Sequence, residues 1–211
     1  MTASPPPPGT LRQATRADAL ATEMPVGRTR GWWGMVFLIA TEATVFALLL
    51  GSYFYLRFQS GRHWPPPGIE KPELTKAIIM TILLLPSSLP VVWAERGIRR
   101  GQPWRLRLGL SLTLIQGLLF LSVQASEYAT NLKKFTITTD VYGSLFYATT
   151  GFHGFHVTIG LVMVAWLLAA SLRGSFGARH HDRVTIVALY WHFVDIVWAF
   201  IFMSLYLSPR L

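Results

Sequence analysis

Five ionisable side chains stand inside long apolar stretches of the chain: Glu42, His153, His156, His192 and Asp195. His153 and His156 are three residues apart, and so are His192 and Asp195. Residues three apart lie on the same face of an α-helix, so each pair would point in one direction. Imidazole and carboxylate groups can bind a metal, hold a proton or form hydrogen bonds. These five residues are therefore the candidate site.

Two kinds of site fit them. In the first, His153, His156, His192 and Asp195 ligate a haem or a non-haem metal, which requires a supporting shell of further polar groups. In the second, the same side chains and Glu42 form a hydrogen-bonded network that ties three helices together. The histidines are too few for the His-rich membrane di-iron enzymes, so we favour the network and expect no metal. Glu42 would serve either as a structural anchor or as a proton-linked group.

Other chemistries are excluded by what the sequence lacks. The chain has no cysteine, which removes zinc–thiolate sites, iron–sulfur clusters, c-type haem attachment and thiol nucleophiles. It contains no Gly-x-Ser-x-Gly elbow, P-loop or dinucleotide fingerprint. Its net charge of +9 comes from basic residues in short loops between apolar runs. That distribution indicates membrane topology and contact with anionic lipid rather than nucleic-acid binding.

The elements that position the candidate site are membrane spans. Of the 211 residues, 52% are hydrophobic and only 14% are charged, against about 25% charged in soluble domains. A helix needs about 20 apolar residues to cross the hydrocarbon core. Five stretches satisfy this, which predicts an all-α bundle of five transmembrane helices, over residues 32–56, 77–94, 108–126, 141–172 and 184–208. Pro86 and Pro90 predict a kink in the second.

The depth of the ionisable groups follows from these spans. Glu42 would lie about 15 Å into the first span and Asp195 about 16 Å into the fifth, both from the same side. His153 would lie about 18 Å into the fourth span from the opposite side. Three helices would therefore place ionisable groups near the middle of the membrane, and we expect these groups to meet.

Basic residues set the expected orientation. They are densest in the loop between the second and third spans, at Arg96, Arg99, Arg100, Arg105 and Arg107. The positive-inside rule then places the N-terminus inside and the C-terminus outside. Residues 1–30 are rich in proline and lack an apolar core, which predicts a disordered cytoplasmic tail ahead of a single domain over 31–211.

Five segments carry a resemblance to a known family: GMVFLIATE at 34–42, QASEY at 124–128, VYGS at 141–144, TGFHGFHV at 150–157 and YWHFVDIVW at 190–198. In these segments and in their order, the sequence resembles subunit III of the haem–copper terminal oxidases, most closely the cytochrome c oxidase branch. The resemblance covers nearly the whole chain after residue 30.

The resemblance implies a non-catalytic subunit of an oxidase that reduces oxygen to water and pumps protons. It implies that this chain binds no haem and no copper, which belong to the partner subunits I and II. It further implies bound phospholipid, support of subunit I and support of proton uptake, with Glu42 matching the family's buried glutamate. The family's histidine and aspartate motifs match His153, His156, His192 and Asp195, which agrees with a metal-free polar network.

Several alternatives stay open. Long members of the family have seven helices, so we expect another chain, such as an extended subunit I, to supply the two that are missing here. Related quinol oxidases also have a five-helix subunit III, although the segments at 34–42 and 124–128 favour cytochrome c as the electron donor. A b-type haem cytochrome and a small transporter with Glu42 and Asp195 as its proton relay are the rival functions. The bacterial plasma membrane is the expected location, with the mitochondrial inner membrane second.

Overall fold

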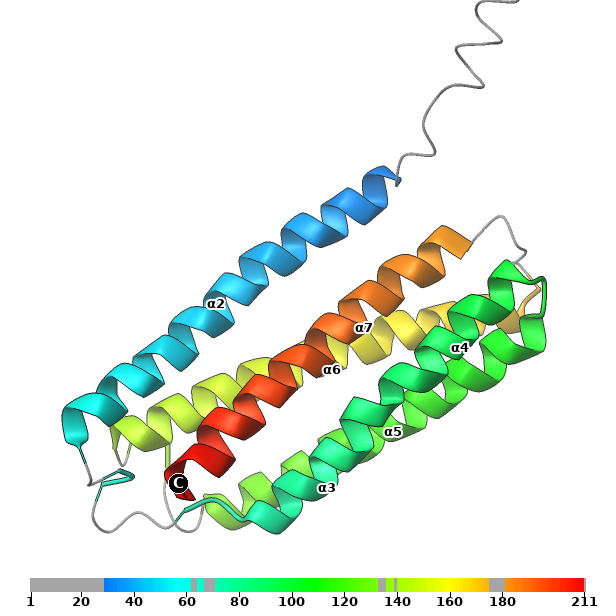
Figure 1. Ribbon diagram of the computed structural model, residues 1–211. Coiled ribbons are helices and arrows are strands. Elements are labelled where there is room, and N and C mark those ends of the chain that lie inside the picture. Colours follow the sequence, from blue (N-terminus) through cyan, green and yellow to red (C-terminus); the bar gives the residue numbers. More distant parts are fainter. Residues whose placement is uncertain are drawn as a thin grey trace, which may run out of the picture.

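The computed structural model describes residues 29–61, 64–66, 71–132, 136–138, 140–174 and 181–210. The tail expected over residues 1–30 lies outside this part of the chain except for its last two residues. The described residues form helices joined by short turns (Figure 1). The helices are α2 (Arg30–Ser60), α3 (Leu74–Leu84), α4 (Ser88–Arg99), α5 (Pro103–Asn131), α6 (Val141–Leu172) and α7 (His181–Ile201).

Two of the spans contain an irregular segment. A 3₁₀ turn, Leu85–Ser87, joins α3 and α4 into one apolar span, Leu74–Arg99. The α7 helix continues as a π-helical segment, Phe202–Leu207, and a 3₁₀ turn, Ser208–Arg210. Within the described residues, five helices are long and apolar enough to cross a membrane. The prediction of an all-α bundle with five transmembrane helices is confirmed.

Local sequence explains where several helices begin and break. Pro103 opens α5, where a missing N–H removes no helical hydrogen bond. Asp140 precedes α6, and its side chain accepts a hydrogen bond from the Val141 N–H at 2.6 Å. Pro86 and Pro90 each lack the N–H that a helix interior requires, and the α-helix is interrupted at Leu85–Ser87. The interruption falls where the two prolines predicted a kink.

Glycines let the helices of the bundle approach closely. A Cβ atom at Gly109 in α5 would lie 2.5 Å from the Pro90 carbonyl oxygen in α4. At Gly160 in α6 it would lie 2.9 Å from the ring of Trp191 in α7, which is fully buried. Helices in a membrane associate through close packing of this kind, since the surrounding lipid is as apolar as their side chains.

The α2 helix is packed differently from the others. In Figure 1 it runs along one edge of the bundle beside α6 and α7, while α3, α4 and α5 lie on the other side of α7. In its most apolar stretch only 6% of the residues are buried, against 56% for α7. Phe46 and Tyr53 are its two buried residues. The α2 helix therefore adds one face to a bundle whose centre is α7.

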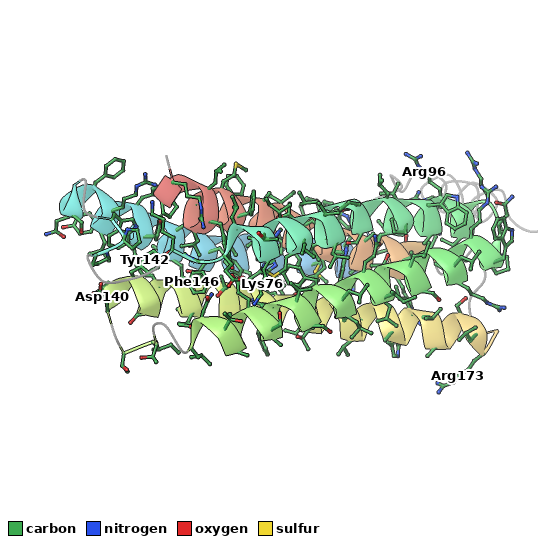
Figure 2. All side chains as sticks on the ribbon, turned by 90° about the horizontal axis from the view of Figure 1, so that it is seen from below. Lys76, Arg96, Asp140, Tyr142, Phe146 and Arg173 are labelled. Carbon is green, nitrogen blue, oxygen red and sulfur yellow. The ribbon has the colours of Figure 1, made fainter. Side chains whose placement is uncertain are left out.

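The two ends of the bundle differ in their polar side chains. Figure 2 shows Arg96 and Arg173 at one end and Asp140 at the other. The end with Arg96 also holds the turn between α4 and α5, where Arg100 and Gly101 follow α4. Beside that turn, Arg105 of α5 lies over the rings of Trp93 and Trp104, with its Cζ atom 5.8 Å and 5.3 Å from their centroids.

Candidate functional site

The first polar group lies between α2 and α6. The carboxyl Oε2 of Glu42 is 3.2 Å from His156 Nε2. The other ring nitrogen, His156 Nδ1, is 2.8 Å from the carbonyl oxygen of Phe152, one turn earlier in α6. The His156 side chain is 5% exposed and that of Glu42 is 31% exposed, so the pair sits at the rim of the helix seam.

The hydrogen-bond partners of this pair indicate which of its atoms carry hydrogens. A carbonyl oxygen only accepts hydrogen bonds, so Nδ1 of His156 must carry a hydrogen. If the imidazole is neutral, Nε2 is an acceptor and the Glu42 carboxyl donates to it. If the imidazole is charged, Nε2 donates to the Glu42 carboxylate. In both states one proton lies between Glu42 and His156.

A small cavity borders the pair. Its volume is about 170 Å³, and its lining is apolar apart from Glu42, His156 and Tyr190. The Tyr190 hydroxyl donates a hydrogen bond to the carbonyl oxygen of His156 at 3.3 Å. Apolar side chains of α2 and α6, among them Met35 and Phe155, form the rest of the wall.

The second polar group lies between α4 and α7. Ser88, the first residue of α4, has its Oγ atom 2.8 Å from His192 Nδ1 and also hydrogen-bonded to Asp195 Oδ2. One residue earlier, Ser87 Oγ accepts a hydrogen bond from Trp191 Nε1 at 2.8 Å. Both serines adjoin the break between α3 and α4, which brings their hydroxyls against α7.

His153 belongs to neither group. It is fully buried, and neither of its ring nitrogens has a hydrogen-bond partner among the described residues. Its ring centroid lies 5.2 Å from that of Trp198, 5.8 Å from that of Phe120 and 6.3 Å from that of Phe46. Aromatic rings from three other helices thus surround it.

The five candidate residues are therefore not joined in one network. The structure brings Glu42 to His156 and brings His192 to Asp195 through Ser88. Across the described residues, no hydrogen bond or ion pair connects these two groups to each other or to His153. The i, i+3 spacing placed His153 and His156 on one face of α6, but their partners on α2 differ. Glu42 lies within hydrogen-bond distance of His156, whereas His153 has the ring of Phe46 beside it.

These contacts leave little room for a haem. His156 has both ring nitrogens engaged, one with Glu42 and one with Phe152. Aromatic side chains fill the space around His153. Within the part of the chain that the structure describes, no three His, Cys, Asp or Glu side chains lie together as a metal site would need.

A further buried carboxyl lies outside the expected site. Glu127 is 1% exposed, and its Oε2 accepts a hydrogen bond from the Tyr206 hydroxyl at 2.8 Å. The expected third span ended at residue 126, but α5 continues to Asn131. The helical spacing in the sequence would have revealed Glu127, because the buried positions of α5 recur every three or four residues. These positions are Thr113, Gly117, Phe120, Gln124, Glu127 and Asn131.

Gln124 on the same face shows how closely α5 and α6 approach. Its Nε2 donates a hydrogen bond to the carbonyl oxygen of Thr150 at 2.8 Å. A Cβ atom at Gly154 would lie 2.8 Å from Gln124 Oε1. Gly154, which separates the two histidines of α6, is therefore the residue that admits the Gln124 amide.

Comparison with known proteins relates the whole bundle to one family. Residues 21–209 match the protein family described as cytochrome c oxidase subunit III. The chain is 36% identical over 179 residues to cytochrome c oxidase subunit 3 of Pongo pygmaeus, which covers 82% of this chain and 68% of that protein. With the same coverage, the identity is 35% to the protein of that name from Homo sapiens and 37% to that from Gallus gallus.

Proposed function

The chain belongs to the cytochrome c oxidase subunit III family, and on that premise we propose that it is the metal-free subunit III of a respiratory cytochrome c oxidase. Membership implies a complex with other oxidase subunits. We assign the haem and copper to subunits I and II, which lie beside this chain, and the supply of electrons to cytochrome c. The role of this chain is to stabilise subunit I and to support proton uptake while the complex reduces oxygen.

The observation that carries the proton-linked role is the contact of Glu42 with His156, which places one proton between the two side chains in either state. Two ionisable groups that share a proton at membrane depth can give it up without leaving two charges in an apolar setting. The partial exposure of Glu42 and the cavity beside it give that proton a route to the surface of the bundle. The role of an anchor alone requires neither feature.

The same proposal includes a place in the membrane. We place the N-terminus inside and the C-terminus outside, because the end with Arg96 and Arg173 is the more basic one. The apolar faces of α2 and α6 would contact phospholipid. The bacterial plasma membrane is the proposed location.

The test is turnover of the purified oxidase complex with Glu42→Gln in this chain. A glutamine amide can still donate to His156 Nε2, so the contact is kept while the titrating proton is lost. We expect the variant complex to start at the wild-type rate and to lose activity faster during sustained turnover. Glu127→Gln is the matched control, because it changes a buried glutamate that contacts Tyr206 instead of His156.

Two results would decide the point. Faster inactivation in Glu42→Gln and wild-type behaviour in Glu127→Gln would support the proton-linked role. Equal inactivation rates in Glu42→Gln and the wild type would contradict the proton-linked role and leave Glu42 with a structural role only.

A further inference from the structure

We propose that Ser88, His192 and Asp195 form a second proton-exchange site, on the α4–α7 side of the bundle and separate from Glu42. The inference rests on the proposed function only for its setting, a complex that handles protons. The contacts that carry it are those of Ser88 Oγ, which bonds to His192 Nδ1 at 2.8 Å and to Asp195 Oδ2.

The three groups form a chain that can run in either direction. In one direction, His192 is charged and carries a hydrogen on both ring nitrogens; its Nδ1–H donates to Ser88 Oγ, and the Ser88 hydroxyl donates to the Asp195 carboxylate at Oδ2. In the other, the Asp195 carboxyl donates to Ser88 Oγ, and the Ser88 hydroxyl donates to His192 Nδ1. A serine hydroxyl has one hydrogen and accepts through its lone pairs, so it fits both arrangements.

Conversion between the two arrangements is a balanced proton transfer. The His192 N–H bond and the original Ser88 O–H bond break, while a new Ser88 O–H bond and an Asp195 O–H bond form. One proton passes from imidazole to carboxyl, no electrons are transferred, and the total charge of the three groups stays the same. The hydroxyl of Ser88 is required, because it makes the contact on both sides.

The surroundings of Asp195 favour a group that exchanges its proton over a permanently charged one. Asp195 is 4% exposed, and its Oδ1 has no hydrogen-bond partner among the described residues. No lysine or arginine in the described ranges forms an ion pair with it. An unpaired carboxylate is costly to bury in apolar surroundings, whereas a carboxyl that can take the proton of His192 avoids that cost.

His192 is the half-buried ionisable member of this site, and its Nε2 makes no hydrogen bond within the described residues. The next acidic group on the α4–α7 seam is Glu95, seven residues after Ser88, or about 10 Å along the helix. Glu95 accepts hydrogen bonds from Arg99 and from Thr185 of α7, each at 2.8 Å. Glu95 is thus the next ionisable group between His192 and the end of the bundle with Arg96, and we place proton entry at His192 Nε2.

The test is infrared spectroscopy of the intact oxidase complex during exchange from H₂O into D₂O. A protonated Asp195 gives a carboxyl C=O band that Asp195→Asn removes and that Ser88→Ala shifts, because the alanine lacks the bonded hydroxyl. We expect deuterium exchange of this band to be about tenfold or more slower in Ser88→Ala, since the relaying group is gone. Ser88→Thr keeps a hydroxyl and should exchange at the wild-type rate.

The outcomes separate this site from the one at Glu42. The band and its exchange rate should be unchanged in Glu42→Gln, whatever that variant does to turnover. Equal exchange rates in Ser88→Ala and Ser88→Thr would overturn the relay. The absence of any carboxyl band that responds to Asp195→Asn or to Ser88→Ala would overturn the proton-exchange site itself.

Discussion

The two polar groups of this protein lie on helix seams of very different construction. Glu42 and His156 meet where α2, a helix with 6% of its most apolar stretch buried, covers one side of α6. The second group, Ser88, His192 and Asp195, lies where α4 packs on α7. Glycines of α5 and α6 allow close packing against both of these helices. Glu42 is 31% exposed and borders a cavity, whereas Asp195 is 4% exposed.

The difference shows how one bundle can hold carboxyls of two kinds. On the α2–α6 seam, α2 contributes only two buried residues, and Glu42 is 31% exposed. On the α4–α7 seam, the proline break, the two serines and the close helix contacts fix the donors and acceptors in place. The proposed proton exchange at Glu42 is therefore assigned to the more exposed seam, and the proposed transfer through Ser88 to the more buried one.

The largest expected effect comes from removing a side chain at the centre of the tight region. The ring of Trp191 packs against Gly117 and Gly160, so Trp191→Ala would leave a cavity beside these two glycines. It would also remove the hydrogen bond from Trp191 Nε1 to Ser87 Oγ. We expect the free energy of unfolding to fall by about 3–5 kcal/mol. Thermal unfolding in detergent, followed by helical circular dichroism, measures it.

The matched control for that substitution lies on α2. Trp33 is 52% exposed, so Trp33→Ala should change the free energy of unfolding by about 0.5 kcal/mol or less. Equal losses for Trp191→Ala and Trp33→Ala would show that the two regions are not packed as differently as the structure indicates.

The next effect concerns helix spacing. Gly109→Ala would place a methyl group 2.5 Å from the Pro90 carbonyl oxygen, and backbone atoms cannot move aside as a flexible side chain can. We expect a loss of about 1–3 kcal/mol in the free energy of unfolding. Gly51→Ala on α2 is the control, because among the described residues no atom outside the local backbone of α2 lies within 4 Å of the added methyl group. A loss as large as that of Gly109→Ala in the isolated chain would contradict this account of α2.

The smallest effect separates the two histidines of α6. His156→Phe removes the hydrogen bonds to Glu42 and to the Phe152 carbonyl, and we expect it to destabilise the protein by about 1 kcal/mol. His153→Phe removes two buried nitrogens that have no hydrogen-bond partner among the described residues, so it should cause no loss of stability. The same unfolding experiment compares them, and a larger loss for His153→Phe would mean that His153 makes a polar contact of its own.

The sequence predicts much of the fold because apolar length alone identifies membrane spans. It also predicts that Glu42, His153, His156, His192 and Asp195 lie in those spans. It does not predict how they are divided, because i, i+3 spacing specifies a shared helix face but not which neighbouring helix covers that face. Whether His153 meets an aromatic ring or a carboxyl depends on where α2 lies.

Two other features of the site were not predicted, the first because no residue pattern contains it and the second because its signal lies past the expected end of a span. The contact of Ser88 with α7 depends on how the break at Pro86 turns the helix, and the pattern of residues does not contain that angle. Glu127 was missed because the polar end of α5 looks like the start of a loop, although the helix and its buried face continue through it. In both cases the polar residue lies near the end of an apolar helix, Ser88 at the start of α4 and Glu127 close to the end of α5.

The most direct test of the central claim is metal analysis of the oxidase complex purified in mild detergent through a tag on this chain. Haem and copper would be measured before and after this chain is stripped from its partners. We predict large membrane partners that keep all of the haem and copper, while the stripped chain carries none. Haem or metal that stays with this chain would contradict the account and would make His153, His156 or His192 a ligand after all.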